Sequence, residues 1–143
     1  MKSAIIGGVG AVGGFLTYLF GGWDSSVVTL LIFMSIDYIT GLIVAGIFHK
    51  SGKSETGSLN SKACWKGLAK KGVTLLLIIV AHFLDVTLGV NFIRDGVAIA
   101  FISNEVISII ENAGLMGIPI PAVVTKAIDM LNSKAELEEK KEV

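Results

Sequence analysis

Residues 49–71, HKSGKSETGSLNSKACWKGLAKK, decide how the chain is arranged. The stretch is rich in lysine, carries one acid (Glu55), and has long apolar runs on both sides. A basic loop between apolar segments long enough to cross a bilayer stays in the cytoplasm, because Lys and Arg near segment ends resist translocation. The sequence therefore predicts a cytoplasmic loop over residues 49–71, with the topology set by Lys50, Lys53, Lys62, Lys66, Lys70 and Lys71.

The composition is that of an integral membrane protein. The chain has 143 residues, a mean hydropathy of +0.75 and 17% charged residues, whereas a soluble domain carries about 25%. The formal net charge is zero, which gives no reason to expect nucleic acid as a partner. Cys64 is the single cysteine and cannot form an intrachain disulfide. In a cytoplasmic loop it would stay reduced, and its simplest interpretation is a bystander thiol.

The first apolar segment, residues 4–20, is glycine-rich and close to the short limit of about 17–25 residues for a membrane span. Gly10 and Gly14 lie four residues apart, a spacing that lets two helices approach closely in lipid. Two interpretations stay open: a self-association face, or a weakly inserted helix that tolerates glycine. A cleaved signal peptide is a third, disfavoured because residues 20–23 (FGGW) make a poor cleavage site.

The second segment, residues 25–48, is the clearest span, and Asp37 lies at its midpoint. An acid at that depth costs about 2.5–3.5 kcal/mol on insertion-derived scales, so it should face a partner, a cavity or water. Gly41 and Ala45 follow on the same stripe of the helix, which makes them candidates for close helix packing.

The third segment, residues 72–90, places His82 and Asp85 three residues apart, as neighbours on one helix face. A proton relay is one interpretation. The favoured one is structural, because both residues fall in the outer third of the span, where polar tips reach the interface.

The fourth segment, residues 92–113, is apolar but interrupted by Asn104 and Glu105. It either spans with a polar stripe turned inward or lies at the interface as an amphipathic helix. Its wide apolar faces favour spanning. The stripe contains Arg94, Ala98, Phe101, Glu105, Ser108 and Asn112.

Beyond residue 113, glycines and two prolines predict the end of that helix. A short interfacial amphipathic helix is expected over residues 121–133, with Val124, Ile128 and Leu131 on one side. Residues 134–143 are expected to form a charged cytoplasmic tail, partly frayed.

The predicted fold class is an all-α integral membrane protein, with a single membrane domain over residues 1–134. Four spans with both termini in the cytoplasm leave only Arg94 outside among the twelve Lys and Arg residues. That asymmetry is what the positive-inside rule demands. If the first or fourth segment does not span, one terminus moves outside and the asymmetry weakens.

No spacing in the sequence indicates catalysis, a metal or a cofactor, because the two histidines and one cysteine fit no metal pattern and no phosphate loop is present. Polar groups on three predicted spans instead suggest helix association, so a homo-oligomer is expected. The candidates for intramembrane or pore-lining polar residues are Asp37, His82, Asp85, Arg94, Asn104, Glu105 and Ser108.

Several stretches in order resemble a known family: Asp37-Tyr-Ile-Thr-Gly41, residues 61–71 leading into an apolar helix that ends near Asp85, and Arg94-Asp-Gly-Val97. Residues 104–105, 108–112 and 117–121 continue the match. From Val27 to Leu131 the chain resembles the phage-lysis and toxin-secretion holins, small multi-span proteins of Gram-positive phages. The glycine-rich first segment matches only in being apolar.

The resemblance implies a holin that accumulates in the cytoplasmic membrane of a host bacterium, self-assembles and opens lesions. Endolysin, or a toxin, would then be released as cargo. Two other classes stay open: a small ion- or proton-conducting channel subunit that uses Asp37 and Glu105, and a membrane scaffold that recruits a soluble partner. The basic loop would also attract anionic lipid headgroups.

Overall fold

The computed structural model describes residues 1–141, apart from the side chains at 135, 138, 139 and 141. The described residues form helices without any strand. The α-helices are α1 (Lys2–Phe20), α2 (Ser25–Ile43), α3 (Ser61–Leu88), α4 (Ile93–Leu115) and α5 (Ala122–Lys141), and a π-helical turn, η1 (Val44–Phe48), extends α2.

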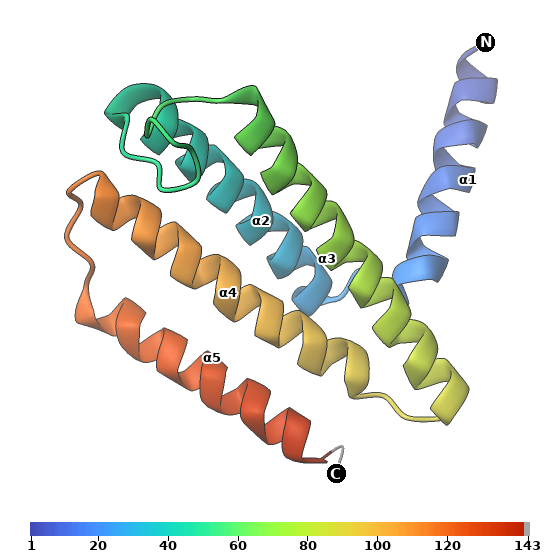
Figure 1. Cartoon of the computed structure of the whole chain (residues 1–143). Coiled ribbons are helices and arrows are strands. Elements are labelled where there is room, and N and C mark those ends of the chain that lie inside the picture. The colour runs from blue at the N-terminus through green and yellow to red at the C-terminus, as the bar shows by residue number, and fades with distance from the viewer. Residues whose placement is uncertain (142–143) are drawn as a thin grey trace.

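Helix α3 runs antiparallel to α2, and α4 runs antiparallel to α3; the three helices pack on one another (Figure 1). Helix α5 returns along α4 and contacts it over much of its length. Helix α1 departs from the bundle and contacts α3 near its own C-terminal end, where the Tyr18 and Phe83 rings meet edge to face at 5.8 Å. The residues of α2, α3 and α4 are therefore packed against neighbouring helices, whereas most of α1 stands apart from them.

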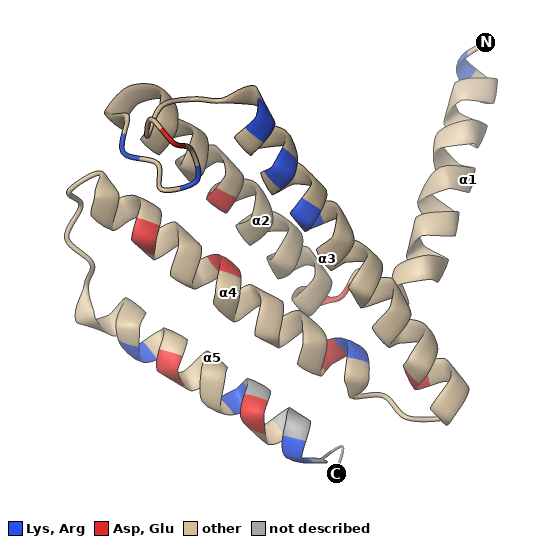
Figure 2. Cartoon of the chain, in the orientation of Figure 1, with Lys and Arg blue, Asp and Glu red and all other residues tan. Residues whose placement is uncertain are grey.

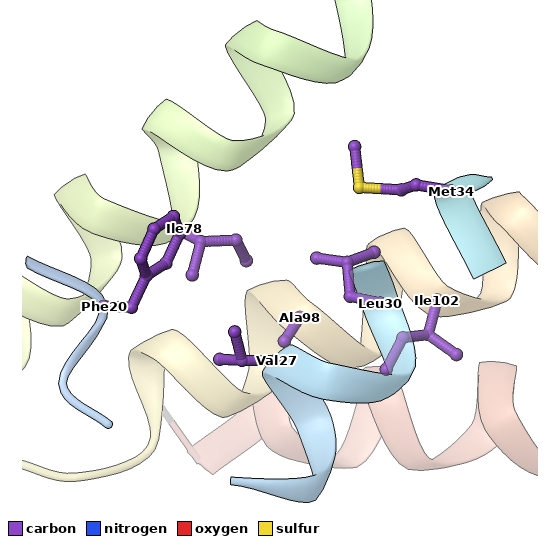
Figure 3. Packing of buried hydrophobic residues seen from close by; sticks show 7 residues of the cluster. All are labelled: Phe20, Val27, Leu30, Met34, Ile78, Ala98 and Ile102. Carbon is purple, nitrogen blue, oxygen red and sulfur yellow. The ribbon is translucent and has the colours of Figure 1, made fainter. Parts of the chain in front are cut away.

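A small apolar core holds α2, α3 and α4 together (Figure 3). Its α2 residues, Val27, Leu30 and Met34, are three and four residues apart and so share one helix face. In a bilayer such a core is stabilised by close packing more than by exclusion of water, because lipid tails are as apolar as the side chains. The remaining core residues are Phe20, Ile78, Ala98 and Ile102.

Among the described residues, three helical segments are long and apolar enough to cross a membrane: Lys2–Phe20, Ser25–Phe48 and Ser61–Leu88. The prediction of an all-helical membrane protein is confirmed at this level. The fourth predicted span, residues 92–113, is a helix, α4, at nearly the predicted bounds.

The structure corrects the predicted loop over residues 49–71, because α3 begins at Ser61 and only residues 49–60 are loop. The Asn60 side chain accepts hydrogen bonds from the backbone N–H groups of Lys62 and Ala63, at 2.9 and 3.4 Å, and so caps the helix. Four of the six topology-setting lysines (62, 66, 70 and 71) therefore belong to a helix.

The C-terminal boundaries are also corrected: the predicted helix over residues 121–133 and tail over 134–143 form one helix, α5, as far as Lys141. Residues 142–143 lie outside the described part. The segment after residue 133 is rich in Ala, Leu, Glu and Lys, which all favour helix. Val124, Ile128 and Leu131 share one side of α5, as predicted, and are half-buried there, while α5 packs on α4.

Candidate functional site

A buried ion-pair network joins the middle of the three bundle helices. The ammonium Nζ of Lys71 on α3 donates to Asp37 Oδ2 on α2 at 2.7 Å and to Glu105 Oε2 on α4 at 2.6 Å. Asn112 Nδ2 donates to Asp37 Oδ1 at 3.1 Å and to Thr40 Oγ1 at 2.9 Å. Asp37, Lys71, Glu105 and Asn112 are hereafter the Lys71 network.

The burial of this network decides its energetic weight. The side chains of Lys71, Asp37 and Glu105 are only 15%, 7% and 13% exposed. Removing one partner of a buried ion pair costs about 3–5 kcal/mol, because the other charge is left uncompensated. The network carries two carboxylates and one ammonium, so its formal charge is −1. Asp37, which the sequence places within an apolar span, therefore faces a cation from α3.

Next to the network lies a cavity of about 530 Å³, bounded by α2, the 49–60 loop, α3 and one side of α4. Asp37, Glu105 and Ser108 line it, and so does Cys64. Gly41 also lines it, and a side chain there would meet Asn112 Nδ2 and Lys53 Nζ at about 4 Å. We call this space the basic cavity, because its lining includes Lys53, Lys66, Lys70 and Lys71.

A second ion-pair network lies at the opposite end of the bundle, around Arg94. Its Nη1 donates to the carbonyl oxygens of Phe20 and Gly21, at 2.9 and 3.0 Å. Its Nη2 pairs with the carboxylates of Asp24 and Asp95. This Arg94 network ties the start of α4 to the end of α1 and to the turn that begins α2.

Figure 2 shows the same division along the bundle: the basic bands of α3 lie in the half of that helix nearest the 49–60 loop. Acidic bands of α2 and α4 lie beside them, and a separate mixed group of charges marks the other end of α4. Within α2, α3 and α4 the charged bands thus gather toward the two ends of the bundle, while α5 carries further charges along its length.

His82 and Asp85 have different neighbours, so the geometry gives no support to a proton relay between them. Asp85 accepts hydrogen bonds from the backbone N–H groups of Ile93 and Arg94, both at 2.9 Å, and so caps the start of α4. His82 packs against the turn after α1, where Gly21 has a φ of 72°. A Cβ at Gly21 would collide with the His82 ring, so this turn requires glycine.

The residues predicted to pack helices together have different surroundings in the structure. Ala45 is buried in the bundle, whereas a Cβ added at Gly10 or Gly14 on α1 would meet no atom within 4 Å. Asn104, predicted as an intramembrane polar residue, is exposed and lies outside the Lys71 network.

Within the described residues, no buried side-chain nitrogen or oxygen lacks a hydrogen-bond partner. A single copy of the chain therefore satisfies its own buried polar groups. These groups do not require a second copy, so the reasons for self-association must be sought on the outer surface.

Sequence reasoning missed Lys71 and the role of Asn112. Lys71 was assigned to the loop because topology rules treat lysines at segment ends as interfacial. The available signal was the four-residue spacing of Lys62, Lys66 and Lys70, which places them on one helix face and extends that helix upstream.

Comparison with known proteins identifies the family of the chain. The model of the bacteriophage holin family matches residues 14–133. The chain belongs to the bacteriophage holin family. Holins are membrane proteins without enzymatic activity, and the prediction that the chain is not an enzyme is confirmed by this membership. Most of α1, residues 2–13, precedes the matched region.

Curated relatives match between 73% and 99% of the chain. An uncharacterised protein of Listeria innocua is 41% identical over 99% of this chain and 93% of its own length. An uncharacterised protein of Clostridium perfringens is 40% identical over 89% of this chain and 90% of its own. A protein named "probable holin" of Bacillus phage phi105 is 33% identical over 73% of this chain and 72% of its own. No solved structure matches the chain.

Proposed function

We propose that this holin oligomerises in the bacterial cytoplasmic membrane and opens lesions large enough to pass a folded endolysin or toxin. Family membership and the similarity to the phage phi105 protein support the holin role. The observation that carries the mechanism is the Lys71 network, which closes a charged site within one copy of the chain.

The proposed topology has four spans, α1 to α4, with both termini in the cytoplasm. In the single chain α5 lies along α4, so in the membrane we propose that α5 separates from α4 and lies at the inner surface. Support for the fourth span comes from its place in the bundle: Ala98 and Ile102 on α4 are buried in the core shared with α2 and α3. Glu105, the residue that argues most against insertion, is paired with Lys71, which it shares with Asp37. An intramembrane charge with a partner is tolerated where an isolated one is not.

The mechanism rests on two states of the same charged groups. In the closed state each chain pairs Lys71 with its own Asp37 and Glu105. In the assembled state α4 moves away from α2 and α3, and these groups face water in a lesion lined by several copies. The closed state accumulates because its pairs are satisfied without neighbours, and the open state needs many copies because only a wide opening hydrates the freed charges.

The test is inducible expression in a bacterium, with and without a cytoplasmic muralytic enzyme that has no signal sequence. The expected result is abrupt loss of membrane potential in both cultures and lysis only in the culture that contains the enzyme. Slow depolarisation without release of the enzyme would overturn the proposal and favour a narrow channel that uses Asp37 and Glu105.

Deleting residues 134–143 distinguishes a membrane scaffold from the proposed holin. A scaffold that binds a soluble partner through these residues would lose its activity, whereas the proposed holin should still lyse cells with altered timing. Membrane levels of the truncated and full chains must be matched by immunoblot for this comparison.

A further inference from the structure

The basic cavity contains more positive charge than the Lys71 network uses. Its lining carries four lysines, Lys53, Lys66, Lys70 and Lys71, against two carboxylates, Asp37 and Glu105. Both carboxylates are bound to Lys71. Within residues 1–141, the side chains that the structure describes give Lys66 and Lys70 no ion-pair partner.

The depth of these lysines makes the surplus charge significant. Because Lys71 pairs with Asp37 and the two helices are antiparallel, residues 61–71 of α3 lie on the side of Asp37 toward the end of α2 and η1. If α2 spans the bilayer, Lys66 and Lys70 lie beside its inner half rather than beyond its end. Cations at that level require water and an anionic counter-charge that the described chain does not supply.

The wall opposite α3 adds hydrogen-bonding groups. The loop contributes Ser51, Ser54 and Ser58 to the lining. The Ser54 hydroxyl donates to the Ser58 carbonyl at 2.8 Å, and Ser58 Oγ is hydrogen-bonded to His49 Nδ1 at 3.1 Å. The Ser51 hydroxyl accepts from the Lys53 N–H and keeps its own hydrogen for a ligand. The loop is ordered by its own hydrogen bonds, with the Ser51 N–H donating to the Gly57 carbonyl at 2.9 Å. Gly57 has a φ of 74°, and a Cβ there would collide with the His49 carbonyl, so glycine is required for this closure. Lysines from α3 and a loop hydroxyl that is free to donate suit a phosphate group.

We propose that the basic cavity binds the phosphate headgroup of an anionic phospholipid, held by Lys66 and Lys70 from α3 and by the Ser51 hydroxyl of the 49–60 loop. The cavity volume of about 530 Å³ accommodates a headgroup together with water. Basic pockets between membrane helices on the cytoplasmic side are a recognised way of binding such headgroups. The site rests on the membrane insertion proposed above but not on lesion formation.

The test uses the full chain purified in mild detergent, with lipid retention followed by native mass spectrometry. Phosphatidylglycerol and phosphatidylcholine are titrated separately. Wild type is expected to retain phosphatidylglycerol in preference. Lys66→Gln/Lys70→Gln should raise the half-saturating phosphatidylglycerol concentration about thirtyfold, at the usual strength of two lysine–headgroup contacts.

The matched control is Lys50→Gln/Lys62→Gln, which removes the same charge from the same basic segment but from residues outside the cavity lining. Its half-saturating concentration should change by less than about threefold. Equal losses in both double variants would overturn the proposal, because they would show diffuse attraction to a basic surface. Lys66→Arg/Lys70→Arg should retain binding, and circular dichroism of every variant checks that its helices are intact.

A competition arm distinguishes lipid from soluble phosphate. Inorganic phosphate and glycerol phosphate at millimolar concentration should not displace phosphatidylglycerol, because they lack acyl chains to lie along the helices. Displacement by either would overturn the lipid assignment and identify a site for free phosphate. Because binding is measured on purified protein, its failure would leave the lysis experiment unaffected, and failure of lysis would leave the binding result standing.

Discussion

The two ion-pair networks have the same charges but different surroundings. Lys71 pairs with two carboxylates, Asp37 and Glu105, and all three side chains are at most 15% exposed. Arg94 also pairs with two carboxylates, but Asp24 and Asp95 are 41% and 44% exposed. The buried network therefore joins three helices at a high cost of disruption, while solvent weakens the exposed one.

The networks also differ in what else their cations hold. Lys71 contacts side-chain carboxylates alone, whereas Arg94 additionally donates to the carbonyl oxygens of Phe20 and Gly21. The contacts of Lys71 are ion pairs, so they can be broken by changing charge. The Arg94 network also fixes backbone, so it should behave as a structural joint rather than as a switch.

The largest effect is expected for Lys71→Met, which leaves Asp37 and Glu105 without their cation. The free energy of unfolding in detergent should fall by about 3–5 kcal/mol. Lys70→Met is the control, because Lys70 is the exposed neighbour and makes no ion pair with the described side chains. Equal stability of the two variants would contradict the assignment of a buried network.

Arg94→Gln is expected to have the next largest effect. It removes the ion pairs to Asp24 and Asp95 and the bonds to two carbonyl groups, at a cost of about 1.5–3 kcal/mol. Arg94→Lys should recover only part of this, because an ammonium lacks the planar fork that reaches several acceptors at once. Thermal unfolding of wild type, Arg94→Gln and Arg94→Lys measures the order of their stabilities. Full recovery of stability in Arg94→Lys would show that only the charge matters at this position.

Asp85→Ala should cost less, about 1–2 kcal/mol, because it removes two hydrogen bonds to the first N–H groups of α4. Hydrogen exchange of the Ile93 and Arg94 amides should become faster, with little change in α2. Val86→Ala changes the exposed neighbour and should leave those amides protected. Unchanged exchange in the Asp85 variant would show that another group caps the helix.

The smallest effect on the single chain is expected on α1. Gly10→Ile/Gly14→Ile adds side chains where nothing lies within 4 Å, so stability should change by less than about 0.5 kcal/mol. Self-association in nanodiscs should nevertheless weaken if this face packs against a second copy. Val12→Leu changes the opposite face of α1 and serves as the control. Unaltered association of the double variant would show that the Gly10/Gly14 face of α1 does not form an interface between copies.

The sequence predicted the helices well where hydropathy alone defines them. Residues 4–20 and 25–48 correspond closely to α1 and to α2 with η1. It failed for residues 49–71, because charge was interpreted as loop although the Asn60 cap and the lysine spacing indicate helix. Basic residues set topology, but they do not by themselves end a helix.

The candidate site was predicted in part. Asp37, Glu105 and Ser108 were selected from their position within apolar segments, and all three line one cavity. Their partner could not be found in the same way, because pairing Lys71 with Asp37 depends on how far α3 slides along α2. That relative depth is set by packing between Ile78 and the α2 core residues, which no local pattern reveals.

The central claim is that the Lys71 network holds the closed form of a lytic protein. The most direct test is the time of lysis onset for Glu105→Gln, in cells that contain the cytoplasmic muralytic enzyme and equal amounts of membrane-inserted chain. Later onset than wild type is predicted, because glutamine still accepts a hydrogen bond from Lys71 and the network becomes neutral. Asn104→Ala, an exposed neighbour outside the network, should keep the wild-type onset. An unchanged onset for Glu105→Gln, or an equal shift in both variants, would contradict the claim.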